Sequence, residues 1–524
     1  MNRKLIKLLH RTEKGQAIIL IAFAFVGLVA MVGLVTDTGI LLIEYGKLKR
    51  SVDAAAIAAA QEYRPRAGAA DLDLERLENA AIGILNLNQV QNLSNIEIHT
   101  CEPDDPARPP LCNEVGGDPM ANRKLVSVTA SSNVIFGFLR VIGINSATLT
   151  ASSLGEAATI DLVLVMDTSA SMAFETGSET YDPLNNINTN LRSDSDDDPS
   201  VCNDPDNFTC EPMRAVKTVA WDFVSHLYFP YDRVAVVTMT SQHAGGSRYP
   251  IEVIPLTSDR GTVQSEIDGV KVFEPRECDG SGDDEGICLQ YDGAGTFGGA
   301  NCEIYDMHSN EYDVNPSSCP SSNVGGVLSL ARQALTGSGN ANNMRLDAFW
   351  VVVALIGGPA NSTDVVDVDY PNGFCPQNTW QLAYQQGPWC RDAYPSTRHY
   401  DSDPLVEYTN PHPDAGGATM DISLYDADDY ARDMADDLAT LTSENGVTIY
   451  TIGLGAQIQN PAKDGSGNPI PGEPPPGEDL LQYIAEEAGG AGINHGQYFY
   501  ASDSSALSNI FERIAQGIAT KISQ

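Results

Sequence analysis

Asp167, Ser169 and Ser171 are the residues whose types and spacing most directly suggest chemistry. One carboxylate and two hydroxyls stand on alternate residues, directly after the apolar run 162–166. Hard oxygen donors at this spacing suit Mg²⁺ or Mn²⁺, with Ca²⁺ as a further alternative. An ordinary turn that joins a strand to a loop uses the same residue types. The spacing by itself leaves both interpretations open.

The elements that position this turn follow from the hydrophobic pattern. The run 162–166 is apolar throughout, as in a strand buried on both faces of a parallel sheet. Strands and helices alternate from residue 158 onwards, which predicts a doubly wound, mainly parallel α/β sheet. Such sheets bind ligands at the carboxyl ends of their strands, where Asp167 stands. We expect strands at 160–166, 233–239, 249–254, 348–356, 447–453 and 497–500, and helices at 213–229, 259–270, 323–336, 418–444, 478–489 and 504–521.

The turn resembles the Asp-x-Ser-x-Ser opening of the metal-ion-dependent adhesion site in von Willebrand factor A domains. The downstream order fits that family over residues 158–524. A second family signature, a Thr-Asn-Ile/Val-Gly turn that opens a helix, is similar to the Ser-Asn-Val-Gly-Gly stretch that begins at Ser322. The resemblance implies that Asp167, Ser169, Ser171 and Ser322 hold a divalent cation, whose shell is completed by a carboxylate of a protein partner.

The third loop of that family usually ends a strand in Thr-Asp-Gly. Here the apolar strand 350–356 ends in Gly357-Gly358, so the expected carboxylate is missing. Asp364 and Asp367, a few residues further on, are the alternative ligands. Without a carboxylate at Gly357, a bound metal would keep more positive charge, favour an anionic ligand and bind with lower intrinsic affinity.

Four insertions rich in Asp, Gly, Pro and Cys interrupt this domain, at 173–212, 272–320, 358–416 and 457–477. Loops this long inside a compact domain are either functional or disordered. Three of the four follow strand ends on the side of Asp167, so we expect them to form a cap over the candidate site.

The ten cysteines favour local disulfides in an oxidising compartment. Their number is even, and none of them forms a CxxC pair or a Cys/His cluster with zinc spacing. Pairing of nearest neighbours is one connectivity among several, and free thiols are the alternative. The candidates are Cys101, Cys112, Cys202, Cys210, Cys278, Cys288, Cys302, Cys319, Cys375 and Cys390.

The formal net charge of −39 limits the kind of partner. A strongly acidic surface repels nucleic acid, which argues against a nucleic-acid partner. No HExxH pair, GxSxG elbow or Walker-type glycine loop is present, so we do not expect an enzyme. A hydrolase carried in the insertions is the minor alternative.

The N-terminus has the composition of a membrane anchor. A basic tail, residues 1–15, precedes an uncharged run from 17 to 35, which is close to the length a helix needs to cross the hydrocarbon core. The basic residues predict a cytoplasmic N-terminus and an extracytoplasmic location for the rest. A cleaved signal peptide is the competing interpretation. Asp37, at the outer end of the span, is expected to snorkel to the interface, with a partner helix as the alternative.

Residues 16–62 resemble the N-terminus of TadE/TadG-like proteins of tight-adherence (Flp) pilus systems. The resemblance rests on Gly15-Gln before the apolar run, Asp37-x-Gly after it and the Ala-rich segment 54–60. It implies a membrane helix with an Ala-rich extension, in a component of a pilus or surface-attachment system. Pilin-like precursors are cut after a cytoplasmic Gly. Gly15 is the only candidate, although Leu20 stands where such precursors carry Glu.

A small membrane-proximal α+β domain is predicted for residues 64–157, with a helix at 69–90 and strands at 96–99, 124–130 and 148–151. The complete prediction is a single-pass envelope protein that binds a protein ligand or other pilus and envelope proteins. A metal-free structural scaffold for pilus or envelope assembly is the alternative function.

Overall fold

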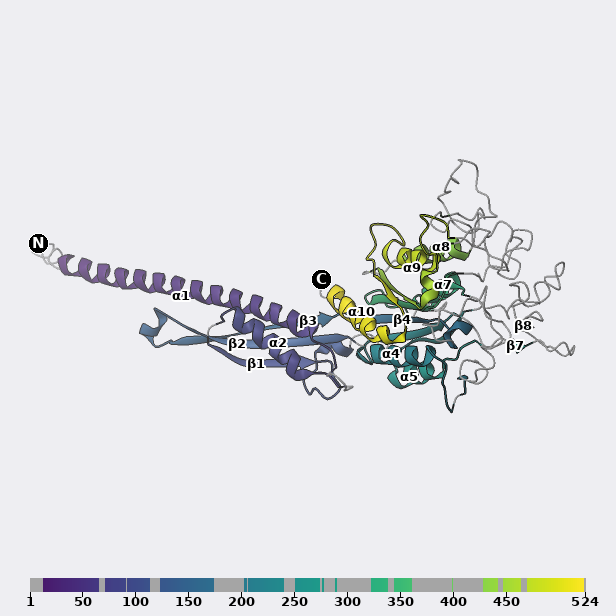
Figure 1. The fold of residues 1–524 in the computed structure, drawn as a ribbon. Coiled ribbons are helices and arrows are strands. Elements are labelled where there is room, and N and C mark those ends of the chain that lie inside the picture. The colour runs from purple at the N-terminus through teal and green to yellow at the C-terminus, as the bar shows by residue number, and fades with distance from the viewer. Residues whose placement is uncertain are drawn as a thin grey trace, which may run out of the picture. The chain divides into compact units, whose positions relative to one another are not determined.

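The chain divides into two compact units, Met1–Ala157 and Ala158–Gln524, each with its own sheet (Figure 1). The computed structural model describes residues 13–65, 71–90, 92–113, 123–173, 202–204, 206–239, 250–273, 276–277, 288–289, 322–337, 344–360, 398, 427–441, 446–462 and 469–522. The predicted ligands Asp364 and Asp367 lie outside these residues.

The first unit begins with a single continuous helix, α1 (Glu13–Gln61). Its N-terminal part is apolar on all sides and exposed, and its length and composition are sufficient to cross a membrane. The predicted N-terminal apolar helix is therefore confirmed. The Ala-rich segment 54–60 has high helix propensity and no Gly or Pro, which explains why the helix continues well past the apolar run.

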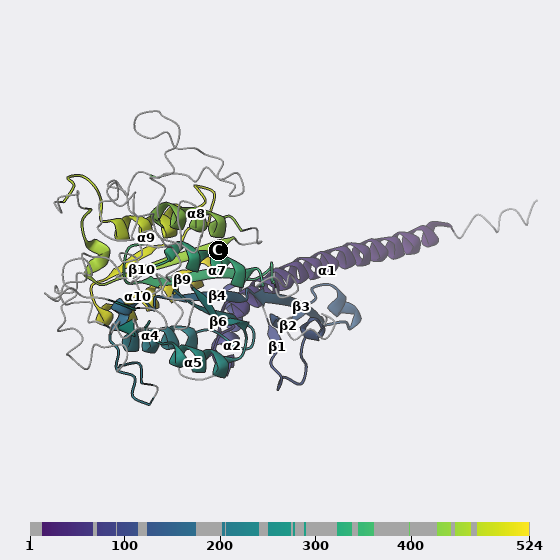
Figure 2. The same ribbon diagram turned by 90° about the vertical axis from the view of Figure 1, so that its right-hand side faces the viewer.

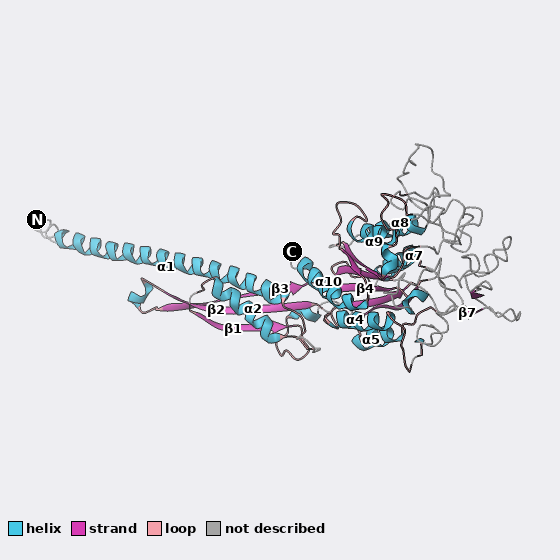
Figure 3. Cartoon of the chain, viewed as in Figure 1, coloured by secondary structure: helices cyan, strands magenta, loops and turns pink. Residues whose placement is uncertain are grey.

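The C-terminal half of α1 packs on a three-stranded antiparallel sheet with order β1 (Leu93–Thr100), β2 (Lys124–Ile135) and β3 (Ser146–Ala157) (Figure 3). Helix α2 (Leu74–Leu87) also packs against α1. The small side chains on this face of α1 allow the helix to lie close to the sheet. At Gly155 the approach is so close that a Cβ atom would lie 2.2 Å from the carbonyl oxygen of Ala56 in α1. A larger residue at this position would force β3 and α1 apart.

Asp37 corrects one prediction. Its side chain is fully buried rather than directed to the interface. The carboxylate accepts hydrogen bonds from the amides of Gly137 (2.9 Å), Phe138 (2.9 Å) and Leu139 (2.7 Å), in the turn between β2 and β3. The snorkelling interpretation was wrong because these three amides, about a hundred residues further along the chain, provide better partners than water.

The second unit contains a six-stranded sheet with the order β11-β10-β9-β4-β5-β6. Numbered along the chain, this is the 3-2-1-4-5-6 order of doubly wound sheets. All neighbours are parallel except the antiparallel edge pair β5 and β6. The predicted fold class is therefore confirmed. The strands are β4 (Ile160–Met166), β5 (Arg233–Thr238), β6 (Ile251–Thr257), β9 (Phe349–Ile356), β10 (Val447–Leu454) and β11 (Tyr498–Ala501). Two further short strands, β7 (Arg276–Glu277) and β8 (Cys288–Leu289), pair with each other.

Helices cover both faces of this sheet (Figure 2). Helices α4 (Met213–Ser225), α5 (Arg260–Gly269) and α10 (Leu507–Ile522) pack on one face against Leu162 and Leu164. Helices α7 (Val324–Leu335), α8 (Ala427–Ala439) and α9 (Pro476–Glu486) pack on the other face against Val163 and Val165. Alternate residues of β4 thus belong to two separate cores, which explains why its residues 162–166 are all apolar.

Four of the ten cysteine candidates form the two disulfides that the structure describes, Cys101–Cys112 and Cys202–Cys210. Both join nearest neighbours in the sequence. The second loop is also held from inside by Asn203, whose side chain donates to the carbonyl of Val272 (2.7 Å) and accepts from its amide (2.9 Å). Cys278, Cys302, Cys319, Cys375 and Cys390 lie outside the described residues.

Candidate metal site at the carboxyl edge of the sheet

Asp167 lies at the point where β4 and β9 separate, which is the topological switch point of the sheet. Its Oδ2 accepts the amide of Gly357 (2.7 Å), directly after β9, and its Oδ1 accepts the amide of Ser169 (2.8 Å). The side chain is fully buried, and this burial raises the pKa of the carboxyl above its ordinary value, although both amides favour the ionised form. One carboxylate thus joins the ends of two neighbouring strands.

The residues after Asp167 form a compact turn. Ser169 is buried, and Ser171 lies in the 3₁₀ turn η3 (Ala170–Ala173) that follows. The carbonyl of Thr168 accepts the amide of Phe273 (2.8 Å), so the segment that opens the second insertion lies beside this turn. The sequence analysis did not predict this contact, because the second insertion follows a predicted helix rather than the end of a strand.

Ser322 lies at the start of α7 and near the end of β9. Its Oγ is 3.4 Å from the position that a Cβ atom on Gly358 would occupy. The next residue, Asn323, caps α7, because its Oδ1 accepts the amide of Gly326 (2.8 Å). Gly325 is needed for packing, since a Cβ atom there would lie 2.3 Å from the ring of Tyr430. The structure therefore brings Ser322 to the same sheet edge as Asp167.

Gln457 is a polar residue at this edge that the sequence analysis did not identify. It lies in the 3₁₀ turn η11 (Ala456–Gln459), directly after β10, and its Oε1 is also 3.4 Å from the Cβ position of Gly358. The sequence could have indicated Gln457, because it follows a predicted strand and parallel strands end at the same edge of a sheet. We did not consider it as a site residue because position 457 also begins a predicted insertion.

The residue types at this edge fit a hard divalent cation, since carboxylate, hydroxyl and amide oxygens are the ligands such ions prefer. They supply one negative charge, from Asp167. Within the described residues, no group of three or more His, Cys, Asp and Glu could hold a metal ion. Each Asp167 oxygen accepts one backbone amide, and because a carboxylate has about four acceptor sites, these two bonds do not exhaust its capacity to bind a cation.

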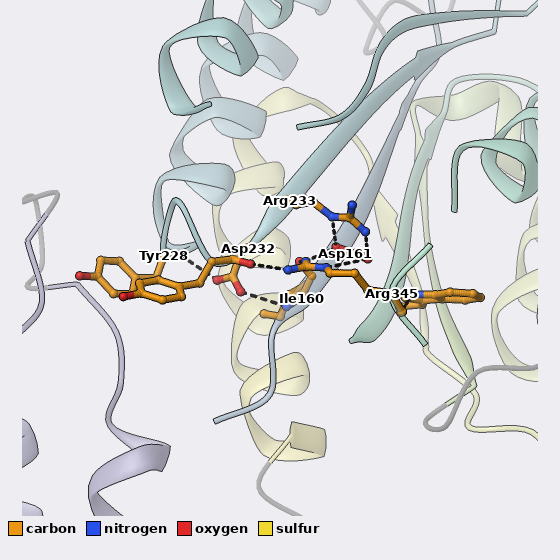
Figure 4. A network of polar contacts seen from close by, with 8 residues as sticks. Ile160, Asp161, Tyr228, Asp232, Arg233 and Arg345 are labelled. Carbon is orange, nitrogen blue, oxygen red and sulfur yellow. Dashed lines mark hydrogen bonds and ion pairs between the residues drawn. The ribbon is translucent and has the colours of Figure 1, made fainter. Parts of the chain in front are cut away.

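The opposite end of β4 holds a buried ion cluster (Figure 4). Asp161 accepts two hydrogen bonds from Arg233, through Nε (2.8 Å) and Nη2 (2.6 Å). Arg345 also pairs with Asp161 and donates to the carbonyl of Tyr231 (2.8 Å). The cluster is remote from Asp167 along the strand. It satisfies buried charges and joins β4 to β5 and to the segment that leads into β9.

Arg398, a described residue within the third insertion, shows where this part of the insertion contacts the domain. The guanidinium of Arg398 pairs with Asp433 and with Asp436 (2.9 Å), both on α8. It also lies over the ring of Tyr483 on α9, 5.3 Å from its centroid. The insertion is therefore attached to the helical layer formed by α8 and α9.

These features define a doubly wound, von Willebrand A-like α/β unit in a chain that begins with an apolar helix. Residues 15–62 match the family model described as "Putative Flp pilus-assembly TadE/G-like". The predicted resemblance of the N-terminus to this family is thereby confirmed. The match fits a membrane-anchored surface protein. No curated protein sequence matches the chain.

Solved structures with a similar arrangement include two from pili. The PilB minor pilin of Streptococcus sanguinis, solved as a point mutant, is 14% identical, with 82% of this chain and 80% of that chain covered and a TM-score of 0.32. The vWF domain of the type V pili tip protein Mfa5 from Porphyromonas gingivalis is 14% identical, with 70% and 97% covered and a TM-score of 0.31. Proximal thread matrix protein 1 from the mussel byssus is 10% identical, with 69% and 49% covered and a TM-score of 0.31, so this chain spans about half of that protein. Identities and TM-scores at this level carry no functional conclusion.

Proposed function

We propose that this protein is a membrane-anchored, extracytoplasmic binding component of a tight-adherence (Flp) pilus or surface-attachment system. The match of residues 15–62 to a pilus-assembly family supports the cellular role. The apolar helix α1 supports the anchor, and the basic tail before it supports a cytoplasmic N-terminus. The observation that carries the binding role is the position of Asp167 at the switch point of the sheet, where such folds bind ligands.

In this proposal Asp167, Ser169, Ser171 and Ser322 hold Mg²⁺ or Mn²⁺, and Gln457 is a further oxygen donor at the same edge. When bound, the cation supplies positive charge that attracts a carboxylate of a protein partner. Neighbouring groups of the chain hold these oxygen atoms in position. The amides of Ser169 and Gly357 orient the Asp167 carboxylate, and the Asn323 cap at the start of α7 holds the Ser322 loop. A single protein carboxylate predicts weaker metal binding than a site with two.

The second candidate function is a metal-free scaffold that packs against other pilus-assembly proteins. One observation favours it, because both oxygens of Asp167 accept backbone amides and so hold two loops together without a cation. The two functions differ in one measurable property, which is saturable metal binding that depends on the hydroxyls of the turn.

Titration of the full-length protein in detergent with Mg²⁺ and Mn²⁺ by calorimetry should show one saturable site. Ser171→Ala should weaken it by at least about tenfold, because a direct ligand is lost and even outer-shell changes cost 10- to 100-fold in affinity. Asp167→Ala should abolish it. Asp206→Ala is the matched control, since it removes the same charge from an exposed position and should leave the site intact. No saturable binding by any of the four proteins, with unchanged melting temperatures, would support the metal-free scaffold instead, and equal binding by all four would place the cation outside this edge.

Gly357→Asp should strengthen metal binding, because it restores the carboxylate that the third loop lacks. We expect an increase in Mg²⁺ affinity of about tenfold or more, since a second negative charge adds to the attraction of the site. The measurement is the same titration, with Gly358→Ala as a control that adds a side chain at the same edge without charge. An affinity unchanged by the new carboxylate would mean that the cation does not bind at this edge.

A further inference from the structure

The turn between β2 and β3 exposes an apolar surface. We define the hairpin tip as residues 136–145, which include the 3₁₀ turn η2 (Leu139–Ile142). Val141 and Ile142 are 86% and 72% exposed, and Phe138 and Ile144 are about half exposed. Large apolar side chains gathered at one protruding point are unusual on a surface that faces only water.

The hairpin tip lies against the outer end of the apolar part of α1. Gly33 of α1 contacts it so closely that a Cβ atom there would lie 2.7 Å from the Cβ of Phe138. One turn further along α1, Asp37 accepts the three amides at the start of η2. At 1.5 Å per residue, Gly33 lies about 3 Å inside the end of the apolar run at Val35. The tip is therefore level with the outer edge of the proposed membrane span.

The backbone of the hairpin tip is suited to leave water. Inside a bilayer, each amide without an acceptor is strongly unfavourable. Asp37 accepts three of the tip amides, and carbonyls within the tip accept others. The amide of Phe136 donates to Asn145 (3.0 Å), that of Val141 to Phe138 (3.0 Å), that of Gly143 to Arg140 (3.1 Å) and that of Ile144 to Leu139 (3.1 Å).

We propose that the hairpin tip inserts into the outer leaflet of the membrane that α1 spans, with lipid acyl chains as its ligand. This rests on the proposed membrane span of α1. Phe138 of the tip meets α1 at Gly33, and the next two α1 residues, Leu34 and Val35, are apolar and exposed, so the tip and the apolar run lie at the same level of the membrane. Arg140 is exposed on the same turn and reaches the phosphate layer, as basic side chains do near the ends of membrane segments. The first unit then holds the membrane at two points, the helix and the tip.

The test uses the full-length protein in phosphatidylcholine vesicles that contain a lipid with a photoreactive diazirine on its acyl chain. After irradiation, mass spectrometry locates the adducts. We expect adducts in the tip and in the apolar run of α1, and none at Leu87. That residue is 77% exposed and apolar, but it lies on α2 near Lys47, about 21 Å further along α1 than Gly33. It is therefore a matched control for exposure without membrane contact.

The double substitution Val141→Glu and Ile142→Glu should reduce adducts in the tip at least tenfold and leave those in α1 unchanged. Leu87→Glu should change neither. Labelled α1 with an unlabelled tip would overturn the proposal while leaving the membrane span intact. Crosslinks from the tip to protein in place of lipid would overturn it as well and would identify the tip as a contact surface for a second protein chain. An unlabelled α1 would refute the span itself, and with it the insertion.

Discussion

Asp161→Ala should destabilise the second unit by about 3–5 kcal/mol, the usual cost of removing one partner from a buried ion pair. Asp161 is fully buried, and both Arg233 and Arg345 direct their guanidinium groups to it. Its removal leaves two buried positive charges without their carboxylate. The measurement is denaturant unfolding monitored by circular dichroism. The denaturant concentration at the midpoint should fall, while the dependence of the unfolding free energy on denaturant concentration should change little.

A matched control is available on the surface of the same unit. Glu211→Gln breaks the pair of Glu211 with the exposed Arg214, and exposed pairs of this kind contribute about 0–1 kcal/mol. Joint replacement of Asp161, Arg233 and Arg345 by apolar residues of similar volume should restore much of the stability, because buried ion clusters are often no better than well-packed apolar groups. A loss of less than 1 kcal/mol in Asp161→Ala would show that the cluster does not stabilise this sheet.

Asp37→Ala should release the hairpin tip from α1. The substitution leaves the amides of Gly137, Phe138 and Leu139 without an acceptor, and each buried donor left unsatisfied costs about 1–3 kcal/mol. We expect hydrogen exchange in the tip to become at least about a hundredfold faster, while the amides of β2 and β3 away from the tip keep their protection. Full-length protein in vesicles, followed by mass spectrometry, gives this measurement.

Asp53→Ala is the control for this effect. Asp53 lies on the same helix and accepts hydrogen bonds from Lys49 (2.7 Å) and Ser153 (2.6 Å), but it holds no backbone amide. Its loss should leave exchange in the tip unchanged. Unaltered tip exchange in Asp37→Ala would mean that packing against Gly33 alone holds the tip in place.

The fold of the second unit could be predicted because its central strands are visible in the sequence as short apolar runs. The run 162–166 is apolar throughout since each of its faces meets a separate helical layer, and the structure places β4 at the predicted bounds, Ile160–Met166. Helix ends were less predictable. The prediction of a helix over 213–229 overran α4, which ends at Ser225, because nothing in the sequence before Pro230 interrupts the helical pattern.

The candidate site could be predicted only in part. Asp167 was placed at this sheet edge because it follows a predicted strand, and Ser322 through the resemblance of its turn to a family signature. The structure brings both to the same edge. Gln457 was missed because its position beside Gly358, at the end of the neighbouring strand β9, is visible only in the structure. The partners of Asp37 could not be foreseen either, since a contact between a helix and a turn about a hundred residues away follows from tertiary packing rather than from periodicity. The cation remains a prediction.

In the proposed attachment role, the unbroken course of α1 has a mechanical consequence. The same helix that contains the proposed span continues to Gln61 and lies along β3, where Gly155 allows close packing and Lys49 donates to the carbonyl of Ser152 (2.9 Å). No loop interrupts this path. Tension on the first unit is therefore transmitted to the bilayer through a rigid rod and is opposed by many contacts at once, so the anchor resists traction without stretching.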